Sequence, residues 1–127
     1  MDRQDVTILK AAAKEASKAS YSPYSKYAVG AAVLTEKGLY AGTNVENASY
    51  GATMCAERVA LFKAVSEGAR QVSALAVYAG PSLPYPCGMC LQALSEFASA
   101  DAPVLIASET EEKELSFKDL LPHPFKG

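Results

Sequence analysis

The chain has 127 residues, a length that fits one domain and leaves little room for a second. Its 12 Lys and Arg residues are set against 14 Asp and Glu residues, so the formal net charge is −2 and the sequence pI is about 5.4. This balance argues against the basic field that non-specific binding to nucleic acid or anionic lipid requires. Half of the residues are hydrophobic, which suffices for a core and excludes wholesale disorder.

The first residues are polar, and no stretch approaches the ~20 apolar residues of a membrane span. We therefore expect a cytoplasmic protein without a membrane partner. Disulfides are rare in that compartment, so the three cysteines favour metal binding or catalysis over structural cross-links.

Hydrophobic periodicity and turn residues divide the chain into alternating helices and strands. A helix is expected first, over residues 5–20, and it ends before the loop that contains Pro23. The elements expected next are strands at 27–35 and 39–45, a helix at 53–67, a strand at 71–79, a helix at 87–100, strands at 103–107 and 112–115, and a helical turn at 116–121.

The order of these elements predicts an α/β fold. Two strand–helix–strand passages, residues 39–79 and 71–107, predict parallel strand pairs with right-handed crossovers. The hairpin formed by the first two strands adds an antiparallel edge. The sequence therefore predicts a mixed sheet covered by helices.

All three cysteines fall where a helix is expected to begin. Cys55 lies in T-M-C-A-E-R, and Cys87 and Cys90 lie in P-C-G-M-C. The free N–H groups and positive dipole end of a helix favour thiolate, the form that binds metal. The two sulfurs of C-x-x-C can face one ion, and Cys55 can join them if the two helix starts lie side by side.

Three ligands indicate a catalytic zinc site, because structural zinc is normally closed by four ligands and catalytic zinc keeps one position for water. The only histidine, His123, lies in the tail. Glu57 follows Cys55 by two residues, which suits the non-ligand acid/base of a zinc deaminase. Taken alone, C-x-x-C also fits a redox pair or two buried small residues, and Glu57 also fits a solvated first-turn acid.

Five segments together resemble the small homotetrameric cytidine deaminases, nearly end to end. They are P-Y-S-K-Y at 23–27, N-V-E-N-A-S-Y-G at 44–51, C-A-E-R at 55–58, P-C-G-M-C at 86–90 and L-L-P-H-P-F at 120–125. The resemblance implies one catalytic domain over residues 1–127, with a three-layer α/β/α fold and about five strands. It also implies one Zn²⁺ per subunit, a homotetramer, and hydrolytic deamination of cytidine and 2′-deoxycytidine in pyrimidine salvage.

The resemblance further implies roles for single residues. Zinc would be held by Cys55, Cys87 and Cys90, and Glu57 would shuttle protons between a zinc-activated water, N3 of the base and the leaving amine. The implied substrate contacts are Asn44 and Glu46 at the ribose 3′-hydroxyl, Tyr27 beside the pyrimidine, the Ala56 N–H at the base, and Tyr50 and Phe125 reaching into a neighbouring subunit's site.

Charge predicts a role for Arg58. Three thiolates on Zn²⁺ leave a net charge of −1, which weakens the metal as a Lewis acid. We expect Arg58 to donate hydrogen bonds to the sulfurs; the alternative is a surface ion pair. The family commonly has P-C-G-x-C-R-Q, whereas Leu91 precedes Gln92 here. The missing arginine indicates either a packing or subunit-contact position or a shifted substrate.

Two other functions fit parts of the sequence. A deaminase of cytosine-containing antibiotic nucleosides, of the blasticidin S type, would use the same scaffold, but N-V-E-N-A-S-Y favours cytidine. A zinc-stabilised nucleoside-binding protein without turnover is the non-enzymatic alternative, and the intact Glu57 argues against it. A polynucleotide substrate is disfavoured by the charge and by a tetramer that closes each site with Phe125.

Overall fold

A computed structural model describes residues 1–127, and the chain begins with the amphipathic helix α1 (Arg3–Ser17). Asp2 caps this helix, because its carboxylate accepts a hydrogen bond of 2.8 Å from the Asp5 N–H. The apolar residues of one face, Val6, Leu9 and Ala13, are buried. The helix ends three residues earlier than the sequence pattern predicts.

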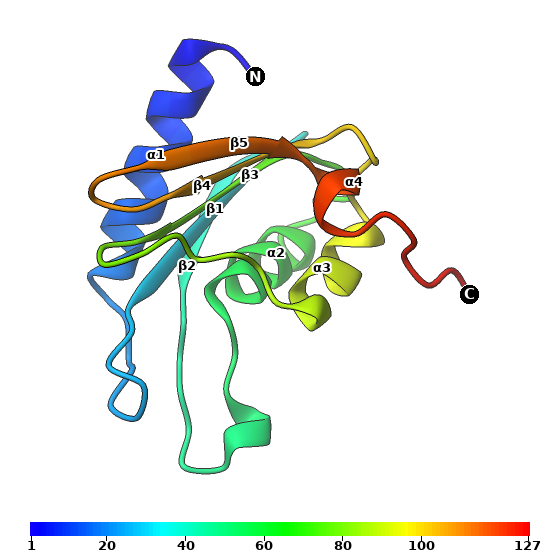
Figure 1. Cartoon of the computed structure of the whole chain (residues 1–127). Helices are drawn as coiled ribbons and strands as arrows, with labels where there is room; N and C mark the ends of the chain where they lie inside the picture. The colour runs from blue at the N-terminus through cyan, green and yellow to red at the C-terminus, as the bar shows by residue number, and fades with distance from the viewer.

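Five strands, three further α-helices and one 3-10 turn follow α1 (Figure 1). They are β1 (Val29–Thr35), β2 (Gly38–Thr43), η1 (Tyr50–Ala52), α2 (Ala56–Ser66), β3 (Val72–Ala79), α3 (Gly88–Ser95), β4 (Pro103–Ala107), β5 (Glu112–Ser116) and α4 (Phe117–Leu120). Every predicted element is present. The helix α3 ends at Ser95 rather than at residue 100, because Ala98 forms a parallel bridge with Val72.

The strands form one mixed sheet in the order β2-β1-β3-β4-β5. Only β3 and β4 pair in parallel, as predicted for residues 71–107; the other three pairs are antiparallel. The parallel pair predicted within residues 39–79 is wrong, because β1 lies between β2 and β3. Almost all of β1 is buried, which suits a central strand, whereas β2 is partly exposed at the sheet edge.

Helices cover both faces of the sheet, which confirms the three-layer α/β/α fold (Figure 1). On one face α1 packs against Ala32, Ala76 and Leu105. On the other face α2 and α3 pack against the alternate side chains, such as Val33, Val77 and Ile106.

Two glycines allow these layers to approach closely. A Cβ on Gly30 would lie 1.8 Å from the Ala13 carbonyl oxygen of α1, and one on Gly42 would lie 2.7 Å from the Ala60 nitrogen of α2. Any larger residue at either position would push a helix away from the sheet.

None of the helices is long and apolar enough to span a membrane.

Candidate functional site

The three cysteines meet where α2 and α3 begin. Cys55 is the N-cap of α2, Cys87 is the N-cap of α3, and Cys90 lies in the first turn of α3. The Sγ atoms of Cys55 and Cys87 are 3.9 Å apart, those of Cys87 and Cys90 are 3.5 Å apart, and all three lie within 4.8 Å of one another. The two helix starts thus lie side by side, as the metal hypothesis requires.

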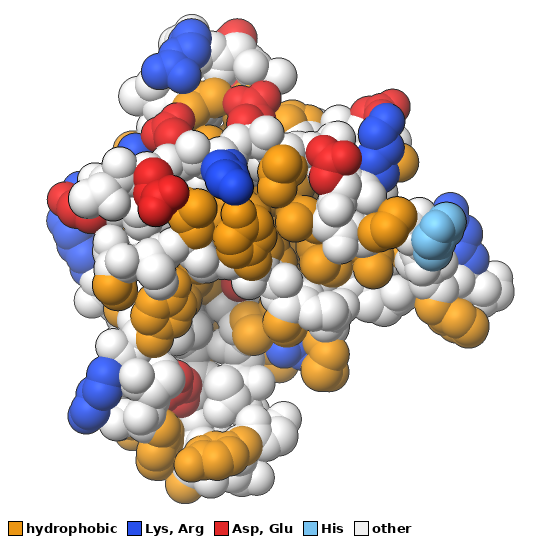
Figure 2. Space-filling view, viewed as in Figure 1, with side chains coloured by type: hydrophobic (Ala, Val, Ile, Leu, Met, Phe, Trp, Pro, Cys, Tyr) orange, Lys and Arg blue, Asp and Glu red, His pale blue; other side chains and the backbone are white.

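The spacing of the sulfurs fits a tetrahedral metal ion. Metal–sulfur bonds of ~2.3 Å at tetrahedral angles separate the sulfurs by about 3.8 Å. The group contains no fourth protein ligand, so one coordination position remains for water or substrate. His123 is not part of it and lies on the projecting C-terminal tail, where it is coloured pale blue in Figure 2. Such a set of three ligands is typical of catalytic zinc.

Arg58 lies against this sulfur cluster. Its Nη2 donates to the Cys55 sulfur at 3.6 Å, while its Nε is buried without a hydrogen-bond partner. Burial of Arg58 acts to lower its pKa, but hydrogen bonding to Cys55 and Cys90 outweighs burial and raises it. The side chain thus contacts sulfur and forms no ion pair with a carboxylate.

The thiols influence one another strongly. Hydrogen bonding from Cys90, with help from Arg58, lowers the pKa of Cys55 to about 5. The hydrogen bond to Cys55 and burial raise the pKa of Cys90. Like charges at this distance repel, so three thiolates can coexist here only around a cation.

A cavity of about 250 Å³ adjoins the cysteines, and Glu57 forms part of its wall. Glu57 as a whole residue is only 5% exposed, although it belongs to the first turn of α2. Burial raises the pKa of Glu57 to about 7. A carboxyl group that titrates near neutral pH is suited to take up and release a proton.

Four of the residues expected to contact substrate line the same cavity. They are Tyr27, Asn44, Glu46 and Ala56. Ala56 is the first residue of α2, so its N–H has no partner within the helix. The structure therefore brings together a carboxylate, an amide and a free N–H beside the cysteines.

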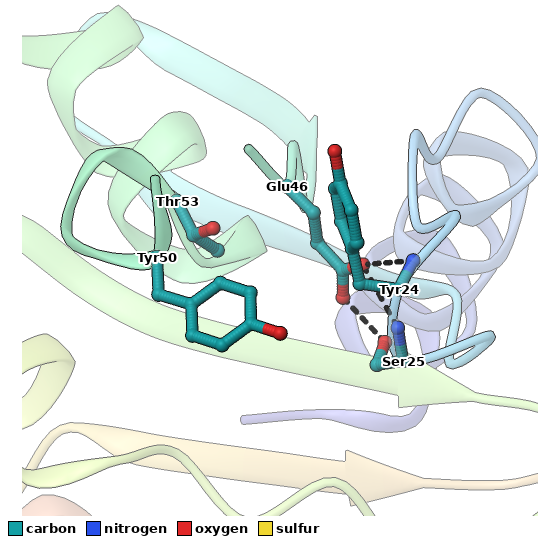
Figure 3. A pocket seen from close by; sticks show the side chains of 5 residues that line it. All are labelled: Tyr24, Ser25, Glu46, Tyr50 and Thr53. Atoms are coloured by element: carbon teal, nitrogen blue, oxygen red, sulfur yellow. Dashed lines mark hydrogen bonds between the residues drawn. The ribbon is translucent and has the colours of Figure 1, made fainter. Parts of the chain in front are cut away.

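Tyr50 lies in an adjoining cavity of about 340 Å³ rather than beside the cysteines. Figure 3 shows its ring across this cavity from Glu46, with Tyr24, Ser25 and Thr53 completing the wall. The rings of Tyr24 and Tyr50 are 6.2 Å apart in an edge-to-face arrangement. The two cavities share Ser25, Glu46 and Thr53, so they adjoin along these three residues.

Phe125 lies outside both cavities, and the residue is 78% exposed. Its backbone is nevertheless fixed, because the Gln92 side chain accepts from the Phe125 N–H at 3.1 Å and donates to its carbonyl at 3.0 Å. The sequence predicts no role for Gln92. The only signal was its place after Cys90 and Leu91 in the family motif.

Leu91 is buried in the core that α2 and α3 share with the sheet. A position where the family commonly has arginine is therefore a packing position in this chain. This placement agrees with the first of the two interpretations offered for the missing arginine.

Comparison with known proteins identifies the class. Residues 2–106 match the family model described as the cytidine and deoxycytidylate deaminase zinc-binding region. Fold and site thus define a zinc-binding deaminase, and zinc is the metal that the Cys55, Cys87 and Cys90 triad is built to hold.

Individual relatives narrow the class to one family. The cytidine deaminase of Sporosarcina psychrophila is 46% identical over 124 residues, covering 95% of this chain and 91% of that protein. The cytidine deaminase of Halalkalibacterium halodurans is also 46% identical, covering 98% and 95%. The crystal structure of cytidine deaminase from Burkholderia pseudomallei superimposes with a TM-score of 0.88 at 39% identity, covering 98% of this chain and 100% of that one. The chain belongs to the cytidine deaminase family.

Proposed function

We propose that this chain is a cytidine deaminase, which hydrolyses cytidine to uridine and ammonia and accepts 2′-deoxycytidine as well. Sequence identity of 46% to two cytidine deaminases, over nearly the full length of the chain, supports the reaction. The observation that carries the proposal is the buried Glu57 carboxyl in the wall of a cavity shared with Cys55 and Cys87. A protein that only bound nucleosides would gain nothing from burying an acid there.

The cysteines and Glu57 perform different parts of the reaction. Zinc would be held by Cys55, Cys87 and Cys90, and it would supply a Lewis acid that makes water nucleophilic near neutral pH. Glu57 would take one proton from the attacking water and deliver it to N3 of the base, which makes C4 electrophilic, and the water oxygen would then bond to C4. Glu57 would next take the remaining proton of the new C4 hydroxyl group and give it to the amine as the C4–N bond breaks, which leaves uridine and ammonia. One carboxyl thus serves as base and then as acid.

The other cavity residues hold the substrate. The Ala56 N–H donates to the base, and Tyr27 lies along the pyrimidine. Asn44 and Glu46 bind the ribose 3′-hydroxyl. A sugar-binding pair beside the acid favours a simple cytosine nucleoside over an antibiotic nucleoside, which is the alternative substrate. Arg58 stabilises the thiolates, because it already donates to the Cys55 sulfur.

A neighbouring subunit completes each site in this proposal. Tyr50 is 77% exposed and Phe125 78%, and the Phe125 backbone is fixed by Gln92. Exposed aromatic rings on a fixed backbone suit insertion into a second copy of the chain, in a homotetramer with one zinc per subunit.

Residues 1–127 act as a single catalytic domain. Because the three thiols must stay reduced to bind metal, the cytoplasm and pyrimidine salvage are the proposed setting.

The test is ultraviolet monitoring of cytidine conversion by zinc-loaded protein, with Glu57→Gln alongside. We expect steady formation of uridine, and a loss of at least about a hundredfold in the variant with zinc content unchanged. Glu67→Gln is the matched control, because this exposed residue at the end of α2 lies outside the cavity. Near-normal turnover by Glu57→Gln would contradict the mechanism, and no conversion by the parent protein would contradict the substrate.

A further inference from the structure

We propose that Ser82 is a positioning residue for the cavity beside the cysteines, and that it acts through the hydroxyl group of Tyr27. The hydrogen bonds between these two residues form a latch, which holds the loop of residues 80–86 as a fixed wall of the cavity. The inference rests on the proposed function for the ligand that fills the cavity. That function places the Tyr27 ring beside the pyrimidine and gives no role to the Tyr27 hydroxyl or to Ser82.

The loop of residues 80–86 forms part of the cavity. It connects β3 to α3 and ends one residue before Cys87. It carries Pro84 and Tyr85, which both line the cavity beside the cysteines. Pro84 is buried, whereas Tyr85 is 51% exposed, so the loop supplies one wall and part of the rim. The position of the loop therefore decides how wide the cavity is at this wall.

The loop has few backbone hydrogen bonds that could hold it in place. Three of its seven residues are prolines, which have no N–H group to donate. Its first residue is fixed, because the Gly80 carbonyl accepts a hydrogen bond of 3.1 Å from the turn between β4 and β5. Within residues 81–86 the one backbone bond is local, from the Tyr85 N–H to the Leu83 carbonyl at 3.2 Å. Leu83 packs against the core, but Ser82 is exposed and has no apolar side chain to pack.

Tyr27 supplies the only hydrogen bonds that join residues 81–86 to another part of the chain. Its phenol oxygen lies 3.1 Å from the Ser82 carbonyl oxygen and 3.0 Å from the Ser82 Oγ. A carbonyl can only accept, so the single phenol proton is donated to it, and the Ser82 hydroxyl donates to the phenol oxygen in return. These two bonds fix the exposed part of the loop to a residue just ahead of the central strand β1.

Tyr27 is a firm anchor because its backbone is held as well. Its N–H donates to the Ser25 Oγ at 3.1 Å, and its carbonyl accepts from the Asn44 Nδ2 at 2.8 Å. Its ring packs against the core that α2 and α3 share with the sheet. Because the phenol proton is donated to the loop, none is left for a substrate. Tyr27 thus offers its ring to the cavity and its hydroxyl to the loop.

Tyr27→Phe removes both bonds of the latch and keeps the ring. We expect KM for cytidine to rise at least about threefold, because a loosened loop must be ordered when the ligand binds. The value of kcat should stay within about twofold, since Glu57 and the cysteines lie at helix starts outside the loop. Tyr40→Phe is the matched control, because Tyr40 lies on β2 outside the cavity. A KM in Tyr27→Phe no higher than in this control would overturn the inference.

Ser82→Ala tests whether the effect of the Tyr27 hydroxyl passes through the loop. This variant loses one bond and keeps the carbonyl, so KM should rise less than in Tyr27→Phe. In the double variant KM should equal that of Tyr27→Phe, because no bond of the latch remains to be lost. Ser82→Thr keeps the hydroxyl and should retain the KM of the parent. Additive increases in the double variant would show that the two side chains act independently, and the latch would be refuted.

Hydrogen exchange of the Tyr85 amide tests the latch without a substrate. In zinc-loaded protein free of nucleoside, NMR should show exchange at least about threefold faster in Tyr27→Phe than in the parent, because the local bond to Leu83 opens more often. Equal exchange rates would overturn the latch even if the parent protein is fully active. The exchange difference without any turnover of cytidine by the parent would support the latch and contradict only the proposed function.

Discussion

The cavity beside the cysteines is built by different physical means at its two ends. At the cysteine end, the ligands lie at or near the first residues of two helices that pack on the core, so regular secondary structure places them. At the Asn44 and Glu46 end, the side chains lie on irregular backbone and are held by hydrogen bonds from residues 20–29. The placement of the cysteines depends on where two helices begin. The placement of Asn44 and Glu46 depends on hydrogen bonds to residues that are distant in the sequence.

Removing one metal ligand should have the largest effect. Cys55→Ala leaves two thiols, which is too few to hold zinc in a catalytic site. We expect zinc content near zero and uridine formation below detection, with far-ultraviolet circular dichroism close to the parent because α2 keeps its buried face. Metal analysis and the cytidine assay check this together. Stoichiometric zinc in the variant would mean that another group replaces Cys55.

Changing the polarity of Asn44 should have the next largest effect. Asn44→Asp keeps the shape but replaces the donor that faces the Tyr27 carbonyl by an oxygen. We expect a loss of about 1–3 kcal/mol in the free energy of unfolding, measured with urea, and at least about a tenfold loss in kcat/KM. Asn47→Asp is the matched control, because Asn47 is exposed and its Oδ1 is already an acceptor, for the Ser49 N–H. Equal stability of the two variants would show that the hydrogen bonds of the Asn44 amide do not stabilise the fold.

Releasing the C-terminal tail should have a smaller effect. Gln92→Ala removes both hydrogen bonds that fix the Phe125 backbone, while the cysteines are unchanged. If Phe125 completes a neighbouring site, KM for cytidine should rise about three- to tenfold with kcat and zinc content nearly constant, since ordering the tail then opposes binding. Phe125→Ala should raise KM at least as much. A fall in kcat at constant KM would show that Gln92 acts on the chemistry instead.

Thinning the core behind the cysteines should change activity least. Leu91→Ala removes a side chain buried between α3 and the sheet, so the free energy of unfolding should fall by about 2–4 kcal/mol. Turnover at 20 °C should stay within about threefold of the parent, because cavity formation does not move the helix starts far. A loss of turnover much larger than this, in protein that is still folded, would place Leu91 in the catalytic arrangement rather than in the packing.

Short spacings account for what could be predicted at the site. Cys87 and Cys90 are three residues apart and Glu57 follows Cys55 by two, so a helix start alone fixes their relative directions. The order of helices and strands likewise predicted a mixed sheet covered by helices, which the structure confirms. The wrong parallel pair has an equally clear cause. The order of the elements along the chain does not show that β1 lies between β2 and β3, because the burial of the strands decides which of them pair.

The sequence by itself determined the ligand set, the acid beside it and the alternation of helices and strands, since each depends on residues within one or two helical turns. Only the tertiary structure decided the order of the strands, the bonds from Ser25 to Glu46 and the bonds from Gln92 to Phe125. Ser25 and Glu46 are 21 positions apart, and Gln92 and Phe125 are 33 apart. Contacts at such separations leave no periodic trace in a single sequence. They form because buried or substrate-facing polar groups must find partners once the chain has folded.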